Sequence, residues 1–584
     1  MKRRSSGRRR LAIAVILTFA IVGVFVVRLV DIQVVRADQL NTDSFDKRAV
    51  KVTTYAARGN IVDANGVVLA DSVMRYDITA SPRMVAAFDR TVKGKTTKVT
   101  VMDASGEIAK ITGQDVNAVY KALTADPKSD FTYVAKSVDT TKLRAIASLA
   151  IPYIYDQKHP ARTYPDGAVA GNLIGFVGTE GAQAGIEYSE NKCLASTNGS
   201  STYERGADGV QIPGSTVTTT KAVDGGTVQL TIDQDLQWFT QQAIAQQATA
   251  IGAKSATAIV LRVKDNHIMA AADWPSVDPN NVGLTPAANR GSLAFTAQYE
   301  PGSTFKAMSA SMLIDTGTKN PTSQVTVPWV WRTPDGVTIH DAGAHPVERL
   351  TLTGVLQQSS NVGISMLGSQ LAEPTRYDYM KKFGLGTPTA VGFPGEASGY
   401  LPKNWDTQTK YNVLFGQGVS ATALQVASIY STIANGGVKL PLTLVEGCTK
   451  PDGTVTDLPK TQGTRVISDA TAKTVANMLE SVVTGGELGP QLRIPGYRVA
   501  AKSGTAEVAG PNGAGYGTDR IVSLAGMAPA EDPQYVVLVT YTKPDIMKTS
   551  AAAAPTFQKI MTQVLKTYRV PPSTTPSTSP PATW

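Results

Sequence analysis

The sequence contains few of the residues on which metal-dependent and cysteine-dependent sites rely. Among its 584 residues there are only two cysteines, Cys193 and Cys448, and four histidines. Cysteines this far apart exclude a disulfide framework and a cysteine-based zinc site, and they leave open one disulfide or two free thiols. No internal repeat with the period of a solenoid is evident. The chain is therefore neither a disulfide-rich scaffold nor a repeat protein.

The histidines do not form a recognisable site. His340 and His345 flank residues 341–344 in a loop, so that a metal pair or a Ser–His dyad is conceivable, but no third ligand and no G-x-S-x-G motif accompanies them. We therefore expect no metal and no cofactor. A nucleophilic serine in this chain would need a base other than histidine.

The net charge of +9 does not indicate nucleic-acid binding. Six of the positive charges stand within the first ten residues, and the rest of the chain carries only +3. No stripe of alternating aromatic and basic residues is present on which bases could stack, so we expect no nucleic-acid partner.

A membrane anchor explains the basic cluster. Residues 11–27 are apolar and uncharged, and the run extends past Arg28 to Val30, which is about the minimum for a helix that spans a bilayer. The run is longer than the usual core of a cleaved signal peptide, and no small-x-small cleavage site follows closely. We predict a cytoplasmic basic tail (1–10), a single-pass anchor in the cell membrane (11–35) and an extracellular remainder, because positive charge stays in the cytoplasm.

Two folded domains and a tail are predicted after the anchor. Residues 36–225 show short β-rich pieces broken by turns and helices, which is typical of an irregular α+β module. From residue 226 the elements are longer and include five strands and two helices: strands 256–263, 267–272, 497–502, 521–527 and 535–542, and helices 236–250 and 555–568. These pieces predict a five-stranded antiparallel sheet covered by helices. Residues 571–584 are rich in Pro, Ser and Thr and are predicted to be a disordered tail.

A serine and a lysine share one helical face after a chain break. Pro301 and Gly302 interrupt the chain, and the following residues favour a helix, which places Ser303 and Lys306 at positions i and i+3. A buried lysine, or one close to a second cation, has a lowered pKa, and its neutral amine can accept a proton from a hydroxyl. The amino terminus of a helix also favours a developing oxyanion. This motif alone is a weak signal, because S-x-x-K arises by chance.

Two further motifs follow in the order that this chemistry needs. Ser359 and Asn361 offer a hydroxyl and an amide two residues apart, and the run Lys502–Thr505 offers a cation, two hydroxyls and a glycine at a strand edge. Taken separately they would be a helix cap and a solvated edge strand. Together, S-x-x-K, S-S-N and K-S-G are variants of the signature shared by penicillin-binding proteins and serine β-lactamases.

The chain resembles class B penicillin-binding proteins, the monofunctional D,D-transpeptidases, over most of its length. The resemblance rests on the anchor and on residues 58–66 (RGNIVDANG), 162–178, 185–187, 231–233, 300–306 (EPGSTFK), 416–418 (GQG) and 502–507 (KSGTAE). Ala64 departs from the family, which often has Arg there. No glycosyltransferase-like segment is found. The 162–178 and 185–187 segments favour the septal, cell-division type of this family. We expect the source to be a Gram-positive bacterium.

The resemblance implies a fold and a set of roles. A pedestal domain of the dimerisation type (36–225) would precede a transpeptidase domain (226–570) with the penicilloyl-serine transferase fold. The catalytic residues would be Ser303 as nucleophile, Lys306 as general base, Ser359 as proton shuttle, Asn361 as holder of the donor amide and Lys502 as electrostatic partner of Ser359. The substrate-binding residues would be Ser503, Gly504 and Thr505, and the backbone N–H groups of Ser303 and Thr505 would form the oxyanion hole.

The implied partners are peptidoglycan stem peptides, β-lactam antibiotics, the cytoplasmic membrane, a polytopic glycan polymerase and division-complex proteins. Several alternatives use the same motifs. An elongation-type transpeptidase differs by its partners, a D,D-carboxypeptidase transfers the acyl group to water, and a β-lactamase would need rapid deacylation and is not expected to carry so large an amino-terminal module. A protein that acts mainly as a scaffold of the wall-synthesis complex, with an idle pocket, is the alternative of a different class.

Overall fold

The computed structural model describes residues 5–92, 94–206, 211–509 and 516–584, and these divide into two compact units. The first unit comprises the residues up to Ala57 together with Ser196–Asp224, and the second comprises Arg58–Ala195 and Gly225–Trp584. Each unit is described by itself below.

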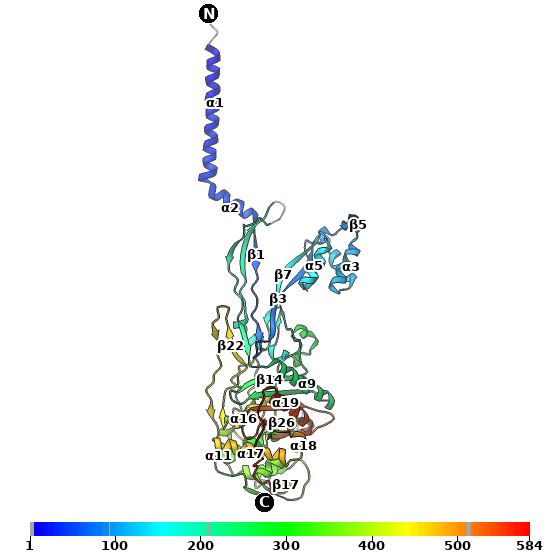
Figure 1. The fold of residues 1–584 in the computed structure, drawn as a ribbon, viewed down its shortest axis with the longest axis vertical. Helices are drawn as coiled ribbons and strands as arrows, with labels where there is room; N and C mark the ends of the chain where they lie inside the picture. The colour runs from blue at the N-terminus through cyan, green and yellow to red at the C-terminus, as the bar shows by residue number, and fades with distance from the viewer. Residues whose placement is uncertain (1–4, 93, 207–210, 510–515) are drawn as a thin grey trace. The chain divides into compact units, whose positions relative to one another are not determined.

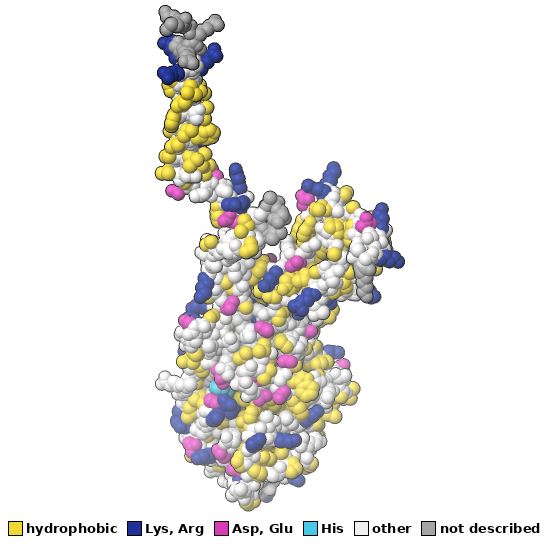
Figure 2. Space-filling model, turned by 45° about the horizontal axis from the view of Figure 1, so that its top comes forward, with side chains coloured by type: hydrophobic (Ala, Val, Ile, Leu, Met, Phe, Trp, Pro, Cys, Tyr) yellow, Lys and Arg dark blue, Asp and Glu magenta, His cyan; other side chains and the backbone are white. Residues whose placement is uncertain are grey.

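The first unit consists of a long apolar helix followed by a small sheet. Its elements are α1 (Ser5–Val30), the π-helical turn η1 (Asp31–Val35), α2 (Ala37–Arg48) and the antiparallel strands β1 (Ala49–Thr54), β10 (Gly199–Glu204) and β11 (Val217–Thr220), in the order β1-β10-β11. Figure 2 shows hydrophobic side chains along α1 and basic side chains gathered at its amino-terminal end. In the described part of the chain, Gly7–Val35 is the one helical stretch long and apolar enough to cross a membrane.

The amino-terminal half of the second unit supplies most of a seven-stranded sheet with the order β23-β22-β12-β2-β3-β6, in which β7 also pairs with β3 and to which β22 and β23 come from later in the chain. These strands are β2 (Ile61–Val62), β3 (Val68–Ala80), β6 (Thr132–Val138), β7 (Ile154–Thr163), β12 (Thr227–Leu230), β22 (Val445–Thr449) and β23 (Val455–Thr456). Three helices pack over the far end of β3, β6 and β7 and enclose a separate small core: α3 (Val101–Thr112), α4 (Val116–Thr124) and α5 (Thr140–Ser148). The short elements of this half are η2 (Pro82–Met84), β4 (Phe88–Val92), β5 (Lys95–Val99), α6 (Gly171–Ile174), β8 (Val177–Gly178), β9 (Gly181–Ala182), α7 (Gly185–Ser189) and α8 (Asn191–Leu194).

The predicted five-stranded antiparallel sheet is confirmed, with the order β14-β13-β27-β26-β25. Figure 1 labels two of its strands, β14 and β26. Its strands are β13 (Ser255–Arg262), β14 (His267–Trp274), β25 (Ala500–Ala509), β26 (Tyr516–Ala528) and β27 (Tyr535–Thr542). The predicted strand 497–502 begins three residues too early, because Tyr497 N–H closes a turn onto the Ile494 carbonyl instead of joining the ladder.

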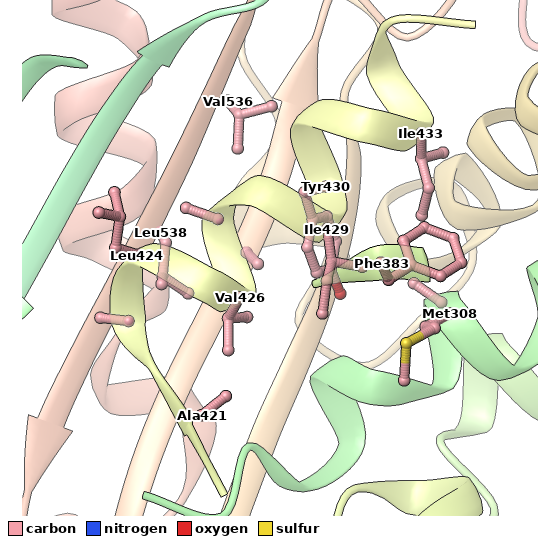
Figure 3. Close-up of a cluster of buried hydrophobic side chains, with 14 of the residues drawn as sticks. Met308, Phe383, Ala421, Leu424, Val426, Ile429, Tyr430, Ile433, Val536 and Leu538 are labelled. Atoms are coloured by element: carbon pink, nitrogen blue, oxygen red, sulfur yellow. The ribbon is translucent and has the colours of Figure 1, made fainter. Parts of the chain in front are cut away.

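Helices cover both faces of this sheet, which explains why its central strand β27 is buried along nearly its whole length and mostly apolar on both faces. Val537 and Val539 of β27 pack with α9 (Gln234–Ile251) and α19 (Ala554–Thr567), whereas Val536 and Leu538 face the other side. On that side α16 (Ala423–Ala434) lies across the sheet and presents Leu424, Val426, Ile429, Tyr430 and Ile433 (Figure 3). The buried α16 thus fills this face of the sheet beside the functional site.

The remaining elements of the second unit surround the functional site or connect its parts. They are η3 (Pro279–Leu284), η4 (Ala287–Asn289), α10 (Leu293–Thr296), β15 (Gln298–Tyr299), η5 (Gly302–Phe305), α11 (Lys306–Asp315), β16 (Gln324–Val327), β17 (Val330–Arg332), β18 (Thr338–His340), β19 (Glu348–Thr351), α12 (Leu352–Gln358), α13 (Asn361–Gly368), α14 (Glu373–Phe383), α15 (Thr409–Asn412), η6 (Val413–Phe415), β20 (Ala421–Thr422), β21 (Val438–Lys439), β24 (Thr464–Arg465), α17 (Asp469–Thr484), α18 (Gly489–Leu492) and η8 (Ser550–Ala552).

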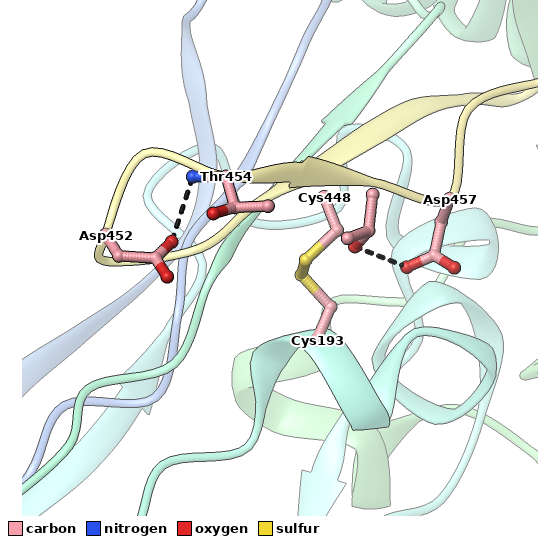
Figure 4. Close-up of a disulfide and its surroundings, with 6 residues drawn as sticks. Cys193, Cys448, Asp452, Thr454 and Asp457 are labelled. Atoms are coloured by element: carbon pink, nitrogen blue, oxygen red, sulfur yellow. Dashed lines mark hydrogen bonds between the residues drawn. A yellow bond between two sulfur atoms is a disulfide. The ribbon is translucent and has the colours of Figure 1, made fainter.

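The two cysteines, whose state the sequence leaves open, form a disulfide. Cys193 of α8 is bonded to Cys448 of β22, across a sequence separation of 255 residues (Figure 4). The bond joins the seven-stranded sheet to the short helices that precede β12. Gly226 passes so close to it that a Cβ there would lie 3.0 Å from the Cys193 sulfur.

Residues 571–584 contact the second unit along their length, so the prediction that they are disordered is wrong. Ser573 N–H donates to the Gly496 carbonyl at 2.9 Å, Ser579 Oγ donates to the Asn477 carbonyl at 2.8 Å, and Thr351 N–H donates to the Ala582 carbonyl at 2.9 Å. Composition indicated too little apolar surface to order this segment, but hydrogen bonds to the body of the domain hold it instead.

A buried ion cluster joins three of the segments on which the family resemblance rests. The Glu187 carboxylate is fully buried and accepts from Arg58 Nε at 2.7 Å and from Arg162 Nε at 2.6 Å. Tyr164 Oη donates to the same carboxylate, and Arg162 Nη1 also donates to the Gly59 carbonyl. These segments are far apart in the sequence, and the cluster explains why each needs a charged residue at this position.

Replacement of Glu187 is expected to be severely destabilising. Glu187→Ala leaves Arg162, which is 6% exposed, without its carboxylate, and an uncompensated buried charge costs about 3–5 kcal/mol of unfolding free energy. Asp130→Ala is the matched control, because it breaks an Arg83 ion pair whose side chains are 60% and 66% exposed, and we expect a loss below about 1 kcal/mol. Denaturant titration of the full chain in detergent measures both. Equal losses would contradict a structural role for the buried cluster.

Candidate active site

Ser303 lies in a tight turn that leads directly into a helix. The 3-10 helix η5 continues into α11, so that Ser303 and Lys306 are three residues apart, as predicted, although the first turn is 3-10 and not α-helical. Gly302 has φ = 58°, a left-handed conformation that glycine adopts without steric cost. Because side chains at i and i+3 eclipse in a 3-10 helix, this turn brings the Ser303 hydroxyl over the Lys306 amine.

The Lys306 amine is the centre of the site. It is fully buried, and its Nζ donates to Ser303 Oγ at 2.9 Å and to Asn361 Oδ1 at 2.7 Å. It also donates to the Ser359 backbone carbonyl, and Ser359 Oγ lies 3.4 Å away. One amine thus connects the first predicted motif to the second.

Ser359 occupies a strained position between two helices. It ends α12 with φ = 61°, a left-handed conformation that is uncommon for a residue with a side chain, and Asn361 begins α13. The resulting sharp turn points the Ser359 hydroxyl and the Asn361 amide toward the same amine. A regular helix through residues 358–361 would not bring the two groups together.

Lys502 approaches Ser359 from the opposite side, on the edge strand β25. Its Nζ donates to Ser359 Oγ at 2.8 Å and to the Ser503 carbonyl at 3.2 Å. Burial lowers the pKa of Lys502 to about 7. Burial, followed by the neighbouring charge of Lys502, lowers the pKa of Lys306 well below its ordinary value, and Asp341 opposes this shift only in part. Both lysines can therefore lose a proton at a lower pH than an ordinary lysine.

Glycines let β25 approach the nucleophile turn closely. A Cβ at Gly504 would lie 2.5 Å from Ser523 Oγ and 2.9 Å from Thr304 Cγ2, and a Cβ at Gly302 would lie 3.1 Å from the Thr505 carbonyl oxygen. Gly416 closes the turn from a third direction, where its carbonyl accepts from Gly302 N–H at 3.0 Å. These contacts explain the glycines of the 416–418 and 502–507 segments.

The strand residues beyond Lys502 contact the site through their backbone, since the Ser503 carbonyl accepts from Lys502 Nζ and the Thr505 carbonyl lies beside Gly302. Ser503 is half-buried and Thr505 is exposed, while Gly504 between them is buried. The structure therefore brings together all eight residues predicted from the sequence: Ser303, Lys306, Ser359, Asn361, Lys502, Ser503, Gly504 and Thr505.

One functional residue, Asp341, was missed at the sequence level. Its buried carboxylate accepts from the backbone N–H groups of Asn361 and Val362 and from Ser360 Oγ, the last at 2.7 Å. It therefore caps α13 and holds the turn that carries Ser359 and Asn361. The only signal in the sequence was an aspartate between two histidines, and nothing in its spacing relates it to residues twenty positions later.

The histidines on either side of Asp341 have roles other than those considered above. His345 Nε2 lies 3.1 Å from Asp341 Oδ2, while His340 provides the backbone carbonyl that accepts from Asn361 Nδ2. In the described ranges no group of three or more His, Cys, Asp or Glu side chains is arranged to hold a metal ion.

Adding one methyl group to Gly504 is expected to disrupt the site. Gly504→Ala pushes β25 away from the turn of Ser303, and a displacement of about 1 Å in such a site costs roughly 100-fold in rate. The measurement is the rate of covalent labelling of the full chain by a fluorescent penicillin. Gly517→Ala on the adjacent strand is the control, because among the described residues the atom nearest to its Cβ would be the Val508 carbonyl oxygen, at 3.6 Å. A Gly504→Ala chain that labels as fast as this control would show that the close approach is unimportant.

Two families match the chain, in the order that the structure shows. Residues 53–230 match the family described as penicillin-binding protein dimerisation domain, and residues 256–562 match the penicillin binding protein transpeptidase domain. Together the two matches cover most of the chain.

Similar proteins and structures span nearly the whole chain. Penicillin-binding protein PbpB of Mycolicibacterium smegmatis is 36% identical over 98% of this chain and 91% of its own length, and peptidoglycan D,D-transpeptidase FtsI of Escherichia coli is 32% identical over 93% and 89%. A peptidoglycan synthetase from Bifidobacterium adolescentis (TM-score 0.71, 32% identity) covers 92% of this chain and 100% of its own. Penicillin binding protein 3 from Mycobacterium tuberculosis, complexed with aztreonam (TM-score 0.68, 30% identity), covers 90% and 99%. The chain therefore belongs to the class B penicillin-binding proteins, in which a dimerisation domain precedes a transpeptidase domain.

Proposed function

We propose that this protein cross-links peptidoglycan stem peptides through an acyl-enzyme on Ser303, and that it does so in septal wall synthesis. The observation that carries the proposal is the Lys306 amine, which is buried, has a lowered pKa and lies 2.9 Å from the Ser303 hydroxyl. We also propose that residues 36–225 form the pedestal domain and residues 226–570 form the transpeptidase domain.

Acylation begins when neutral Lys306 accepts the Ser303 proton. Ser303 Oγ then attacks the carbonyl carbon of the penultimate D-Ala in the donor peptide, and the carbonyl oxygen becomes an oxyanion. The backbone N–H groups of Ser303 and Thr505 stabilise this charge. The close packing of Gly302 against Thr505 supports this pairing, because it brings the two backbones into contact.

Collapse of the tetrahedral intermediate needs a proton for the leaving amine of the terminal D-Ala. Ser359 Oγ is suited to deliver it, because it lies 2.8 Å from Lys502 Nζ and 3.4 Å from Lys306 Nζ and can pass a proton between them and the substrate. Asn361 holds the donor amide, and the hydroxyls of Ser503 and Thr505 receive the terminal carboxylate before it departs with D-Ala.

An acceptor amine from a neighbouring stem peptide completes the transfer. It attacks the Ser303 ester, loses its proton through the same relay and forms the cross-link, which frees Ser303. A β-lactam acylates Ser303 in the same way, but its leaving group stays tethered to the acyl group and blocks the acceptor.

Covalent labelling tests the nucleophile and the product tests the reaction. We expect the full chain in detergent to form a stable adduct with a fluorescent penicillin, which mass spectrometry maps to Ser303, and we expect no adduct with Ser303→Ala. Lys306→Ala is expected to lower the labelling rate by at least about 100-fold, since general base catalysis contributes 10²–10⁴-fold. A folded chain that forms no adduct would favour the scaffold alternative. With donor and acceptor peptides, cross-linked dimers indicate a transpeptidase, and free acid products indicate a D,D-carboxypeptidase.

The two lysines predict a bell-shaped dependence of the acylation rate on pH. Lys306 must be neutral, so the rate rises as pH increases through its lowered pKa. Lys502 must be charged to hold Ser359, so the rate falls as pH increases through about 7. Lys502→Arg keeps its charge and is expected to move the descending limb to higher pH. A rate that climbs steadily to pH 10 would indicate that Lys306 has an ordinary pKa.

We propose that the amino terminus lies in the cytoplasm and the catalytic domain lies outside the cell membrane. The basic cluster before α1 supports this orientation. The Cys193–Cys448 disulfide supports it independently, because such bonds persist in oxidising compartments. Protease added to intact spheroplasts is expected to digest the second unit and leave a short amino-terminal fragment. If the second unit were completely protected from the protease, the orientation would be the opposite of the one proposed.

The proposed partners are a polytopic glycan polymerase and division-complex proteins, contacted through the anchor and pedestal. A polymerase would supply the glycan strands whose peptides are cross-linked. Photo-crosslinkers placed along α1 test this contact, and capture of no polytopic membrane protein in growing cells would contradict it.

A further inference from the structure

Residues 571–584 follow a defined path over the transpeptidase domain although they lie beyond the matched part of that domain, which ends at residue 562. They attach at three places. Near Gly496 and Arg498 the contacts involve Ser573 and Thr575, at α17 they involve Asn477, and the final residues contact Thr351. We call this segment the strap.

The last attachment is the most specific. Thr351 N–H donates to the Ala582 carbonyl at 2.9 Å, and Thr351 Oγ1 donates to the Pro581 carbonyl at 2.6 Å. Thr583 pairs with Leu350 in an antiparallel bridge, and the Arg349 guanidinium lies over the Trp584 ring, 5.3 Å from its centroid. The strap therefore pairs with the end of β19.

Thr351 is also the residue that caps α12. Its Oγ1 accepts from Gly354 N–H at 3.1 Å, so the same hydroxyl joins the strap to the first turn of the helix. Helix α12 has only seven residues and is followed directly by Ser359, whose hydroxyl lies between the two active-site lysines. Because a helix this short is about 10 Å long, a shift of its first turn moves its last turn too.

Gly354 shows how closely the strap lies against this helix. A Cβ at Gly354 would lie 1.9 Å from the Ala582 carbonyl oxygen, and the nearest atoms to it all belong to Ala582. The strap therefore occupies the space that a side chain at position 354 would need.

We propose that the strap positions Ser359, through Thr351 and α12, and that efficient acylation of Ser303 depends on it. Thr351 is accordingly a positioning residue and does not touch the reacting atoms. This inference rests on the proposed role of Ser359 as proton relay.

Truncation after Val570 tests the inference, with the full chain in detergent as reference. Stopped-flow labelling with a fluorescent penicillin separates the acylation rate constant from the affinity of the non-covalent complex. Truncation is expected to lower the rate constant by about 10- to 100-fold, as for small displacements of a catalytic group, and to change the affinity less than threefold. Addition of a peptide of residues 571–584 is expected to restore the rate constant, which a general loss of stability would not allow.

Gly354→Ala provides a second, independent test. In the full chain its Cβ excludes Ala582, so it is expected to reproduce the effect of truncation. In the truncated chain it should cause no further loss, because the space is vacant and alanine is a better helix former than glycine. Asn477→Ala is the matched control, since it removes the side-chain hydrogen bonds to Thr578 and leaves Thr351 untouched, and we expect a change below twofold.

Three results would overturn the inference: an unchanged rate constant after truncation, a loss that the peptide does not restore, or additive losses from Gly354→Ala and truncation. Each of these is distinguishable from failure of the proposed function, in which the full wild-type chain would not label at Ser303 at all.

Discussion

Two lysine side chains are buried side by side around a single serine hydroxyl, and the chemistry of this protein depends on that arrangement. Lys306 and Lys502 are both fully buried, and both lie within reach of Ser359 Oγ. Two ammonium groups cannot both stay charged at such a place without a large cost in desolvation and repulsion. Their lowered pKa values follow from this cost, and a neutral amine next to Ser303 is the result.

The rest of the transpeptidase domain serves to keep this arrangement in place. Helix α16 fills one face of the five-stranded sheet with large apolar side chains, and the edge strand β25 lies beside η5, which carries Ser303. Glycines at 302, 416 and 504 allow close approach at the turn, because a Cβ at any of them would lie within 3.1 Å of an atom of a neighbouring segment. Asp341 caps α13 and the strap holds the start of α12, so that the turn between these helices is fixed at both sides.

In the pedestal segments of the second unit, too, distant parts of the chain meet at a single charged or covalent contact. Glu187 collects two arginines from separate segments, and the disulfide joins residues 255 positions apart. Such contacts bring little stability unless they are fully satisfied, but once formed they are costly to break. They therefore specify how the short strands and helices of this region come together.

The sequence by itself determined the elements and the order of the chemistry. The uncharged run after the basic cluster predicted the anchor helix, apolar runs predicted the strands of the central sheet, and three short motifs named eight residues that the structure brings together. Tertiary structure alone decided the pairing of Cys193 with Cys448, the lowered lysine pKa values, the left-handed turn at Ser359, the role of Asp341 and the ordered path of residues 571–584. The physical reason is that local patterns encode backbone preference and burial, whereas a pKa, a cap or a docked segment depends on groups that lie far away in the sequence.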